Sequence, residues 1–368
     1  MRRHLERIAA MVIKEFRQIF RDPRMARVIF VAPVIQLLVF GYAVSTDIAN
    51  TGTFLVDHDR SREARELVDT LTASGYFRIV GRSDRPEDLV QALQRGDAVV
   101  GLTIPVNFAR DLRSGAGASV QILLDGTNSN TASIAQGYAE RIVADFGRRR
   151  SRGFSLPVEL RDRPWFNPNL ESRDYNVPAV VGALIMLICL LLTSLAVVRE
   201  REIGTLEQLE VSPLTAFDLI AGKTIPFAVI GLVDLTIVTA VALYWFEVPF
   251  RGSFVLLLGA SVLYILSALG IGLFISTISA TQQEAFMSSF LVFMPAILLS
   301  GFMFPVTSMP EIFQWATLLN PVRHYIEIVR AVFLKGAGFS ELSRQFGALF
   351  LIGTSVLLFA TRRFRKNG

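Results

Sequence analysis

The chain has 368 residues, of which 52% are hydrophobic, and its formal net charge is +5 at pH 7. This composition is too apolar for a wholly soluble protein and favours membrane spans combined with one polar domain. In a membrane protein, excess lysine and arginine belongs to the cytoplasmic flanks of the spans, not to a nucleic-acid site. The single cysteine, Cys189, excludes an intramolecular disulfide, and the three scattered histidines form no metal-binding spacing.

The N-terminal region predicts a surface helix followed by a membrane span. Residues 1–27 are basic, with apolar residues at helical spacing, and predict a cytoplasmic interfacial amphipathic helix that ends at Asp22-Pro23. Residues 28–46 carry no charge and are long enough to cross about 30 Å of hydrocarbon, so we expect transmembrane helix 1 there. A cleaved signal peptide ending near Ala43-Val44-Ser45 is the alternative, but the apolar run is too long and the basic leader too extended.

Residues 47–176 alternate between strand-like and helix-like patterns. Strands are expected at Thr53–Val56, Phe77–Val80, Ala98–Ile104 and Val120–Leu124, with helices between them and a longer helix at Thr131–Phe146. Such alternation predicts a small α/β domain. Because the basic N-terminus favours the inside of the membrane, a domain that follows the first span is expected outside the cytoplasm.

The rest of the chain predicts five more spans. Transmembrane helix 2 is expected at residues 177–198, and helices 3–6 within residues 223–361, at Lys223–Phe246, Gly252–Thr277, Glu284–Phe304 and Phe346–Ala360. Residues 305–336 are broken by Asn320-Pro321 and predict a re-entrant or interfacial hairpin. Six spans return the basic tail, residues 362–368, to the cytoplasm. The expected fold class is an α-helical integral membrane protein with six transmembrane helices and an extracytoplasmic α/β domain inserted between helices 1 and 2.

Residues 199–222 form a short polar connection between two apolar segments. Ile203, Leu206 and Leu209 recur at three-residue spacing, which predicts one apolar face of a helix. Ser212-Pro213 ends this helix, because proline lacks an N–H group and restricts the residue before it. A helix of this kind at the membrane surface is either a solvated loop helix or a docking element for a cytoplasmic partner.

The end of this connection superficially matches a nucleotide-binding motif. Gly222-Lys223-Thr224 fits the last residues of a phosphate-binding loop, but Phe217 occupies the position of the required first glycine. The motif also lies at the start of a span instead of a strand-to-helix turn. We therefore expect no nucleotide site and no enzymatic activity in this chain, and we assign Lys223 to the cytoplasmic membrane interface.

The run REREIGTLEQL at Arg199–Leu209, followed by Ser212-Pro213-Leu214, resembles the coupling segment of ABC-2 type permeases, the membrane subunits of one class of ATP-binding-cassette exporters. KEFRQIFRDPR in the leader resembles their entry helix, and Asn320–Tyr325 resembles their external hairpin region. The resemblance points to the bacterial drug-efflux branch and covers nearly the whole chain. It implies a protein of the bacterial inner membrane with both termini in the cytoplasm.

The resemblance also implies partners and a function. An ABC ATPase subunit would dock on the coupling segment and supply ATP hydrolysis, so this chain itself would bind no cofactor and no metal. A second permease, in a homodimer or heterodimer, would complete the pathway for a hydrophobic or amphipathic substrate such as a drug. Membrane lipids and a periplasmic adaptor protein are further implied partners. The residues assigned to ATPase coupling are Glu200, Glu202, Gly204, Thr205, Glu207, Gln208 and Pro213.

Two functions from other classes compete with export. A membrane receptor with an external ligand-binding α/β domain would need a cytoplasmic output domain, for which the internal segments are too short. An ATP-independent secondary transporter would favour paired intramembrane charges and inverted repeats, and we find no repeat.

Two groups of polar residues can be interpreted as either structural or functional. Asp234 is the one carboxylate well inside a span, so it is either a functional group or a partner in a helix–helix contact, such as one with Arg323. Asp57-His58-Asp59 has the residue types of a metal site, but neighbouring side chains on a strand point to opposite faces. We therefore expect a solvated loop there.

Overall fold

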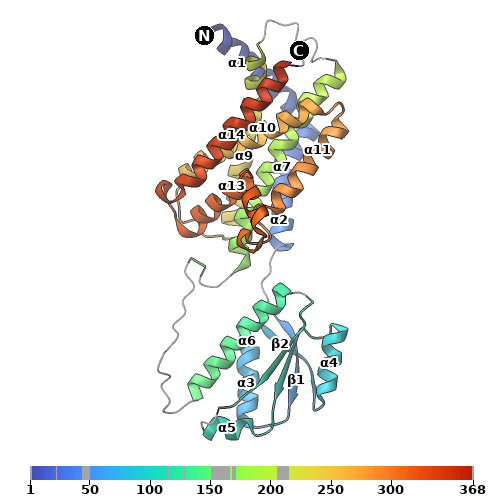
Figure 1. Ribbon diagram of the computed structural model, residues 1–368, viewed down its shortest axis with the longest axis vertical. Helices are drawn as coiled ribbons and strands as arrows, with labels where there is room; N and C mark the ends of the chain where they lie inside the picture. The colour runs from blue at the N-terminus through green and yellow to red at the C-terminus, as the bar shows by residue number, and fades with distance from the viewer. Residues whose placement is uncertain are drawn as a thin grey trace. The chain divides into compact units, whose positions relative to one another are not determined.

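The computed structural model describes residues 2–21, 23–43, 50–114, 117–127, 129–150, 166–167, 171–204 and 215–366. The chain divides into two compact units. Met1–Ser45 and Pro164–Gly368 form the first, which we call the helical unit, and Thr46–Arg163 forms the second, which we call the α/β unit. Figure 1 shows the elements of each unit.

The helical unit consists of helices packed around an apolar core. In chain order they are α1 (Arg2–Arg21), α2 (Pro23–Ala43), α7 (Ser172–Ile203), α9 (Ala216–Tyr244), α10 (Phe254–Ile278), α11 (Gln282–Leu298), η1 (Val306–Ser308), α12 (Glu311–Thr317), α13 (Pro321–Arg330), η2 (Ala331–Lys335) and α14 (Phe339–Lys366). Within the described residues, five helices are long and apolar enough to cross a membrane: α2, α7, α9, α10 and α14. The protein is therefore mostly helical, with five candidate membrane spans.

The last two predicted spans differ in length from the helices observed. The last one, expected at Phe346–Ala360, belongs to the 28-residue helix α14. Glu341 and Arg344 lower the hydropathy of its first turns, but backbone hydrogen bonds continue regardless of side-chain polarity. The expected span at Glu284–Phe304 corresponds to α11, which has 17 residues and ends at Leu298. The chain turns there, because Gly301 adopts a left-handed φ of +82°.

The N-terminal helices meet at a proline, as the local sequence requires. Pro23 is the first residue of α2, a position where the missing N–H group costs nothing. The predicted span therefore starts five residues earlier than residue 28, and α1 ends at Arg21. On α1, Met11, Glu15 and Ile19 are buried, so one stripe of this helix faces the bundle.

The short helix α13 is among the most buried parts of the helical unit. Tyr325 stacks on Tyr264 of α10, with ring centroids 4.0 Å apart. The Tyr264 hydroxyl donates to the Gly182 carbonyl of α7 at 2.8 Å, and the hydroxyls of Tyr325 and Ser261 are 2.7 Å apart. These contacts satisfy both buried phenols and hold α13 against α7 and α10.

The α/β unit contains a four-stranded sheet of order β2-β1-β3-β4. Its elements are β1 (Thr51–Asp57), α3 (Arg62–Ala73), β2 (Phe77–Ser83), α4 (Pro86–Arg95), β3 (Val100–Ile104), α5 (Phe108–Ser114), β4 (Gln121–Leu124) and α6 (Ser129–Arg150). β1 runs parallel to β2 and β3, and β4 is antiparallel to β3. Helices α3 and α6 lie on one side of the sheet and α4 on the other (Figure 1).

Local signals account for the helix boundaries of the α/β unit. The Ser61 hydroxyl accepts a hydrogen bond from Ala64 N and caps α3. Gly96 ends α4 with a left-handed φ of +76°, a conformation that glycine adopts without strain. Leu67 of α3 and Leu102 of β3 belong to the same buried core, which seals one face of the sheet.

Candidate functional site

The candidate site begins in the last turn of α7, which forms the start of the predicted coupling segment at residues 199–222. Gly204 ends α7 with a φ of +79°, and its N–H group donates to the carbonyls of Glu200 and Arg201. A left-handed residue at this position is a common helix C-cap, and glycine adopts it without a Cβ penalty. Gly204 therefore fixes where the helix stops and the connection to α9 begins.

Four charged side chains from three helices meet beside this turn. Lys223 Nζ of α9 lies 2.6 Å from Glu200 Oε2 of α7 and 3.4 Å from Glu15 Oε1 of α1. Lys14 Nζ of α1 lies 2.5 Å from Glu200 Oε1 and 3.2 Å from Glu15 Oε1. The four residues, which we call the charge quartet, carry two positive and two negative charges and are therefore neutral overall.

Most of the charge quartet is removed from solvent. Lys223 is 1% exposed, Glu15 3% and Glu200 5%, whereas the Lys14 side chain is 43% exposed. Buried charges are tolerated only when they are paired and hydrogen-bonded, so the four positions depend on one another. Burial opposes the charge of Lys14, but the hydrogen bond to Glu200 and the charge of Glu15 outweigh it, and the pKa of Lys14 is raised.

Helix α1 is also anchored to the start of α9. Thr215 and Asp218 form a capping box at the N-terminus of α9. Asp218 Oδ1 lies 2.8 Å from His4 Nδ1, which joins the first turns of α1 and α9. Gly222 allows close contact between these helices, because a Cβ at this position would lie 2.6 Å from Met11 Cγ. The first turns of α9 are therefore held closely against α1.

The same turn of α7 contacts the connection between α10 and α11. Glu202 accepts a hydrogen bond at 2.8 Å from the backbone N–H of Gln282, the first residue of α11, and another from the Gln282 side chain. Arg201 Nη1 donates to the Ser279 carbonyl at 2.8 Å. A carboxylate at a helix N-terminus is favourable, because free N–H groups and the helix dipole point toward it. Glu202 thus connects α7 to the start of α11.

The residues assigned to coupling fall into three groups. Glu200 is buried and contacts α1 and α9, while Glu202 is exposed and Gly204 caps α7. Thr205, Glu207, Gln208 and Pro213 lie outside the described residues. Lys223, which the sequence places at the cytoplasmic membrane interface, is buried in the charge quartet.

The sequence interpretation missed three members of the charge quartet: Lys14, Glu15 and Lys223. One signal was present in α1. Glu15 lies in the same helical stripe as the apolar residues Met11 and Ile19, four residues from each. An acid in an apolar stripe predicts a buried carboxylate that needs a cation, although its partners cannot be read from spacing.

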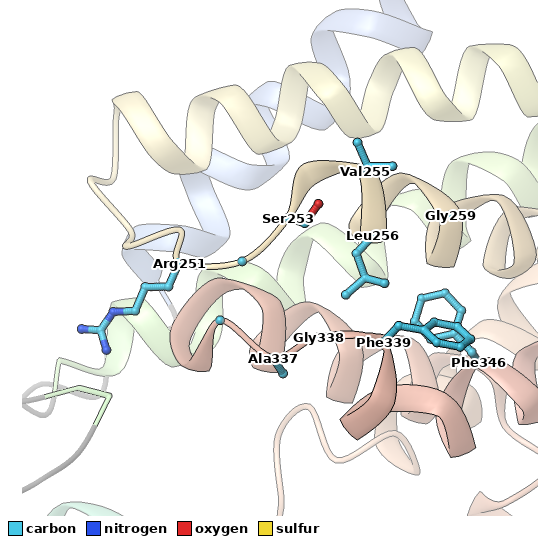
Figure 2. Close-up of a pocket in the computed structure, with 11 residues that line it drawn as sticks. Arg251, Ser253, Val255, Leu256, Gly259, Ala337, Gly338, Phe339 and Phe346 are labelled. Atoms are coloured by element: carbon cyan, nitrogen blue, oxygen red, sulfur yellow. The ribbon is translucent and has the colours of Figure 1, made fainter.

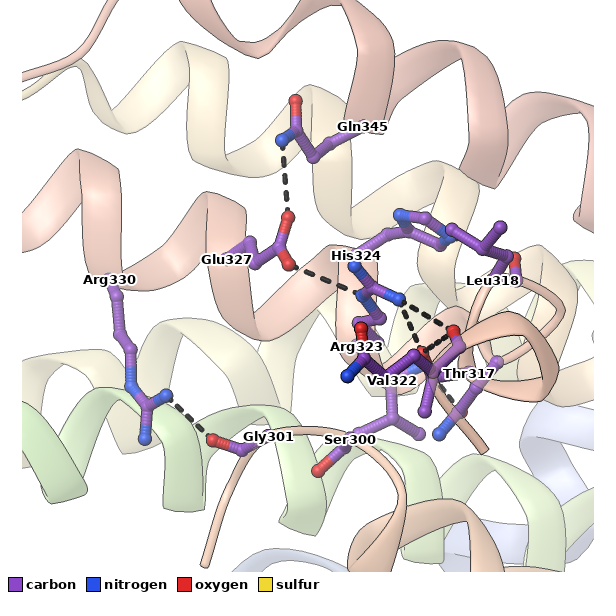
Figure 3. Close-up of polar contacts among 12 residues, drawn as sticks. Ser300, Gly301, Thr317, Leu318, Val322, Arg323, His324, Glu327, Arg330 and Gln345 are labelled. Atoms are coloured by element: carbon purple, nitrogen blue, oxygen red, sulfur yellow. Dashed lines mark hydrogen bonds and ion pairs between the residues drawn. The ribbon is translucent and has the colours of Figure 1, made fainter. Parts of the chain in front are cut away.

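Asp234 is buried in α9 and does not contact Arg323. Both Asp234 carboxylate oxygens lack a hydrogen-bond partner among the described residues. Arg323 instead donates to the Thr317 hydroxyl and the Gln314 carbonyl and pairs with Glu327 at 3.4 Å (Figure 3). The sequence hypothesis of an Asp234–Arg323 pair is therefore wrong.

Side chains in the expected hairpin region, residues 305–336, form hydrogen bonds to backbone carbonyls of neighbouring segments. Arg330 Nη1 donates to the Gly301 carbonyl at 2.9 Å (Figure 3), and Arg330 Nε donates to the Tyr175 carbonyl at 3.1 Å. The Arg330 guanidinium also stacks over the Tyr175 ring, 3.6 Å from its centroid. Glu327 accepts a hydrogen bond from Gln345 of α14 at 3.1 Å. These contacts tie α13 to the beginnings of α7 and α14.

An open groove of about 670 Å³ lies between the first turns of α10 and α14. Leu256, Gly259, Phe339 and Phe346 provide much of its apolar lining, and Arg251 lies at one end (Figure 2). Such a lining offers contact to an apolar molecule but no acid–base pair. No group of three potential metal-ligating residues is found in the part of the chain that the structure describes.

Comparisons with known proteins agree on one family. The family model described as "ABC-2 family transporter protein" matches residues 27–362. Among curated proteins, the chain is 33% identical to the "Probable multidrug ABC transporter permease YbhR" of Escherichia coli (strain K12), over 98% of this chain and 99% of the relative. It is 34% identical to the permease YbhS of the same strain, with 95% and 94% covered, and 30% identical to the "Inner membrane transport permease YhhJ", with 99% and 98% covered. The chain is therefore a member of the ABC-2 family of ABC transporter permeases.

Proposed function

We propose that this chain forms the transmembrane pathway of an exporter and couples it to ATP hydrolysis on a separate ATPase subunit. The observation that carries the proposal is the charge quartet. Glu200 and Lys223 flank residues 205–214, and both are paired in the quartet with α1. A force applied to the connecting segment would therefore reach α7, α9 and α1 together.

Coupling then follows as a movement of connected helices. The ATPase would contact the segment through Thr205, Glu207, Gln208 and Pro213. Glu200 would transmit the displacement inward to α1 and α9, and Glu202 would transmit it to α11 through the Gln282 backbone. Packed helices respond to such a push by rigid shifts instead of continuous bending, which suits a change between two conformations of the pathway.

The proposed topology has six spans with both termini in the cytoplasm of a bacterial inner membrane. Five candidate spans support it, and α11, at 17 residues, would be the sixth, followed by the re-entrant hairpin at 305–336. Arg362 and Arg363 near the end of α14 suit a cytoplasmic location, as do the basic residues of α1. Residues 47–176, which contain nearly all of the α/β unit, would then lie outside the cytoplasm.

The proposed assembly contains two permeases, as a homodimer or heterodimer, and two ATPase subunits. Its substrate would be a hydrophobic or amphipathic molecule, a class that includes drugs. Relatives named as multidrug transporter permeases support this assignment. A periplasmic adaptor would bind the external domain, and membrane lipids would surround the exposed apolar side chains of α2 and α11.

Co-purification tests the proposal most directly. The tagged chain is extracted from its native membrane in several mild detergents and probed for an ATP-binding-cassette subunit. We expect the ATPase to co-purify with the parent chain, to be lost with Glu207→Arg, and to be retained with Glu311→Arg. Glu311 is an exposed acid at the start of α12 and serves as the matched control for charge reversal. Absence of any ATPase with the parent chain, or equal loss in both variants, would overturn the proposal.

A further inference from the structure

Asp234 differs from every other fully buried charged side chain among the described residues. The buried Asp, Glu, Lys and Arg side chains are Glu15, Glu63, Glu200, Asp218, Lys223 and Asp234. The first five form ion pairs or hydrogen bonds with neighbouring side chains. Asp234 is 1% exposed, and neither carboxylate oxygen has a partner. Among the described residues, Asp234 is therefore the buried acid whose carboxyl group has neither an ion pair nor a hydrogen bond.

The surroundings of Asp234 are tightly packed and apolar. Gly231 lies one turn before Asp234, and a Cβ there would come within 2.8 Å of Cys189 Sγ on α7 and 3.2 Å of Ile265 Cδ1 on α10. Leu235 and Val238, which follow on α9, are fully buried. Gly231 therefore lets α7 and α10 approach α9 closely one turn from Asp234.

Among the described residues, no charged group from the helices packed on α9 pairs with Asp234. From α7, the titratable group near this turn is the Cys189 thiol, which is fully buried and packs against Gly231, one turn before Asp234. α10 contains no charged residue, and the Tyr264 hydroxyl is bonded to the Gly182 carbonyl. The quartet that α1 forms with α9 is centred on Lys223, about three turns before Asp234. Helices α2 and α14 have their charged residues at their ends: Arg24, Arg27, Glu341, Arg344, Arg362, Arg363, Arg365 and Lys366.

An ionised carboxylate is far more costly to bury without a partner than the neutral acid. We propose that Asp234 is a proton-binding site, neutral while α7 and α9 are packed as observed and ionised only in a conformation that separates them. On separation, the O–H bond breaks, the proton passes to entering water, and the hydrated carboxylate remains. By linkage, raising the pH favours the separated conformation, and closing the helices takes up a proton. This inference goes beyond the coupling proposal and does not require the ATPase.

The chain provides its own reporter for this equilibrium. Cys189 is the only cysteine and is fully buried at the α7–α9 contact. The experiment measures the rate at which N-ethylmaleimide labels the full-length permease in lipid nanodiscs, without an ATPase, from about pH 5.5 to about pH 8.5. Thiolate formation accelerates labelling with pH in every variant, so the informative quantity is the ratio of the parent rate to the Asp234→Asn rate.

We expect this ratio to rise with pH, by up to about tenfold per pH unit where the carboxyl group titrates. Asp234→Ser, which also removes the ionisable group, replaces Asp234→Asn if that variant does not fold. Leu235→Ala loosens the neighbouring packing but retains the carboxyl group, so its rate should keep the pH dependence of the parent. A ratio that stays constant with pH would overturn the proposal, as would a Leu235→Ala variant that behaves like Asp234→Asn.

Discussion

The charge quartet predicts that its two lysines differ sharply in importance, because both pair with Glu15 and Glu200 but only Lys223 is buried. Lys223→Met keeps the length of the side chain and removes its charge. Glu15 and Glu200, 3% and 5% exposed, would then share the single cation Lys14. Breaking a buried ion pair by removing one partner costs about 3–5 kcal/mol, because the remaining charge is buried without compensation. We expect a loss of this size in the free energy of unfolding.

Lys14→Met is the matched control for this change. The Lys14 side chain is 43% exposed, so its ion pairs with Glu15 and Glu200 are partly solvated and water can replace much of their stabilising effect when the ammonium group is removed. Exposed ion pairs are typically worth about 1 kcal/mol or less. The Glu200→Gln, Lys223→Met double variant should lose less free energy of unfolding than Glu200→Gln and Lys223→Met lose together, since it removes both members of an ion pair.

Reversible unfolding in mixed micelles, followed by circular dichroism, measures these differences. The parent, Lys223→Met, Lys14→Met, Glu200→Gln and the double variant are compared in the same lipid and detergent mixture. If Lys223→Met and Lys14→Met cost the same, or if Lys223→Met costs less than about 1 kcal/mol, water reaches the whole quartet and the argument from burial fails.

Three further predictions concern other contacts. Arg113 hydrogen bonds lower the pKa of Glu63, so this pair stabilises the α/β unit above the ordinary glutamate pKa and loses its effect as pH falls through the lowered value. Protease resistance of that unit within the full chain should therefore decline less on acidification in Glu63→Gln than in the parent. Gly222→Val should push Met11 away and cost about 1–3 kcal/mol in the same unfolding assay, whereas Gly222→Ser should cost less. Ser289→Ala removes a hydroxyl 2.9 Å from the Ser194 hydroxyl of α7 and should cost about 0.6 kcal/mol, and a loss beyond about 2 kcal/mol would contradict a single interhelical hydrogen bond.

Apolar length and local chemistry, both readable along the chain, predicted where the helices of the bundle lie. A run without charge such as residues 28–46 has few stable alternatives to a membrane helix, so its position was clear even though Pro23 starts the helix earlier. Likewise, Gly96 and Ser61 mark helix ends through their own backbone and side-chain chemistry. The ends of α11 and α14 were harder to predict, because hydropathy measures polarity whereas a helix ends where its backbone hydrogen bonding stops.

The sequence by itself determined the family, the apolar segments and the position of the connecting segment, because these depend on residues adjacent along the chain. Only the tertiary structure decided which charges are neighbours. Lys223 and Glu15 are separated by 208 positions, and their contact depends on how α1 and α9 are rotated and packed. The same holds for Asp234, whose isolation is a property of all the surrounding helices together. Spacing within one helix can indicate a buried charge, as it does for Glu15, but the partner of that charge is decided by packing in three dimensions.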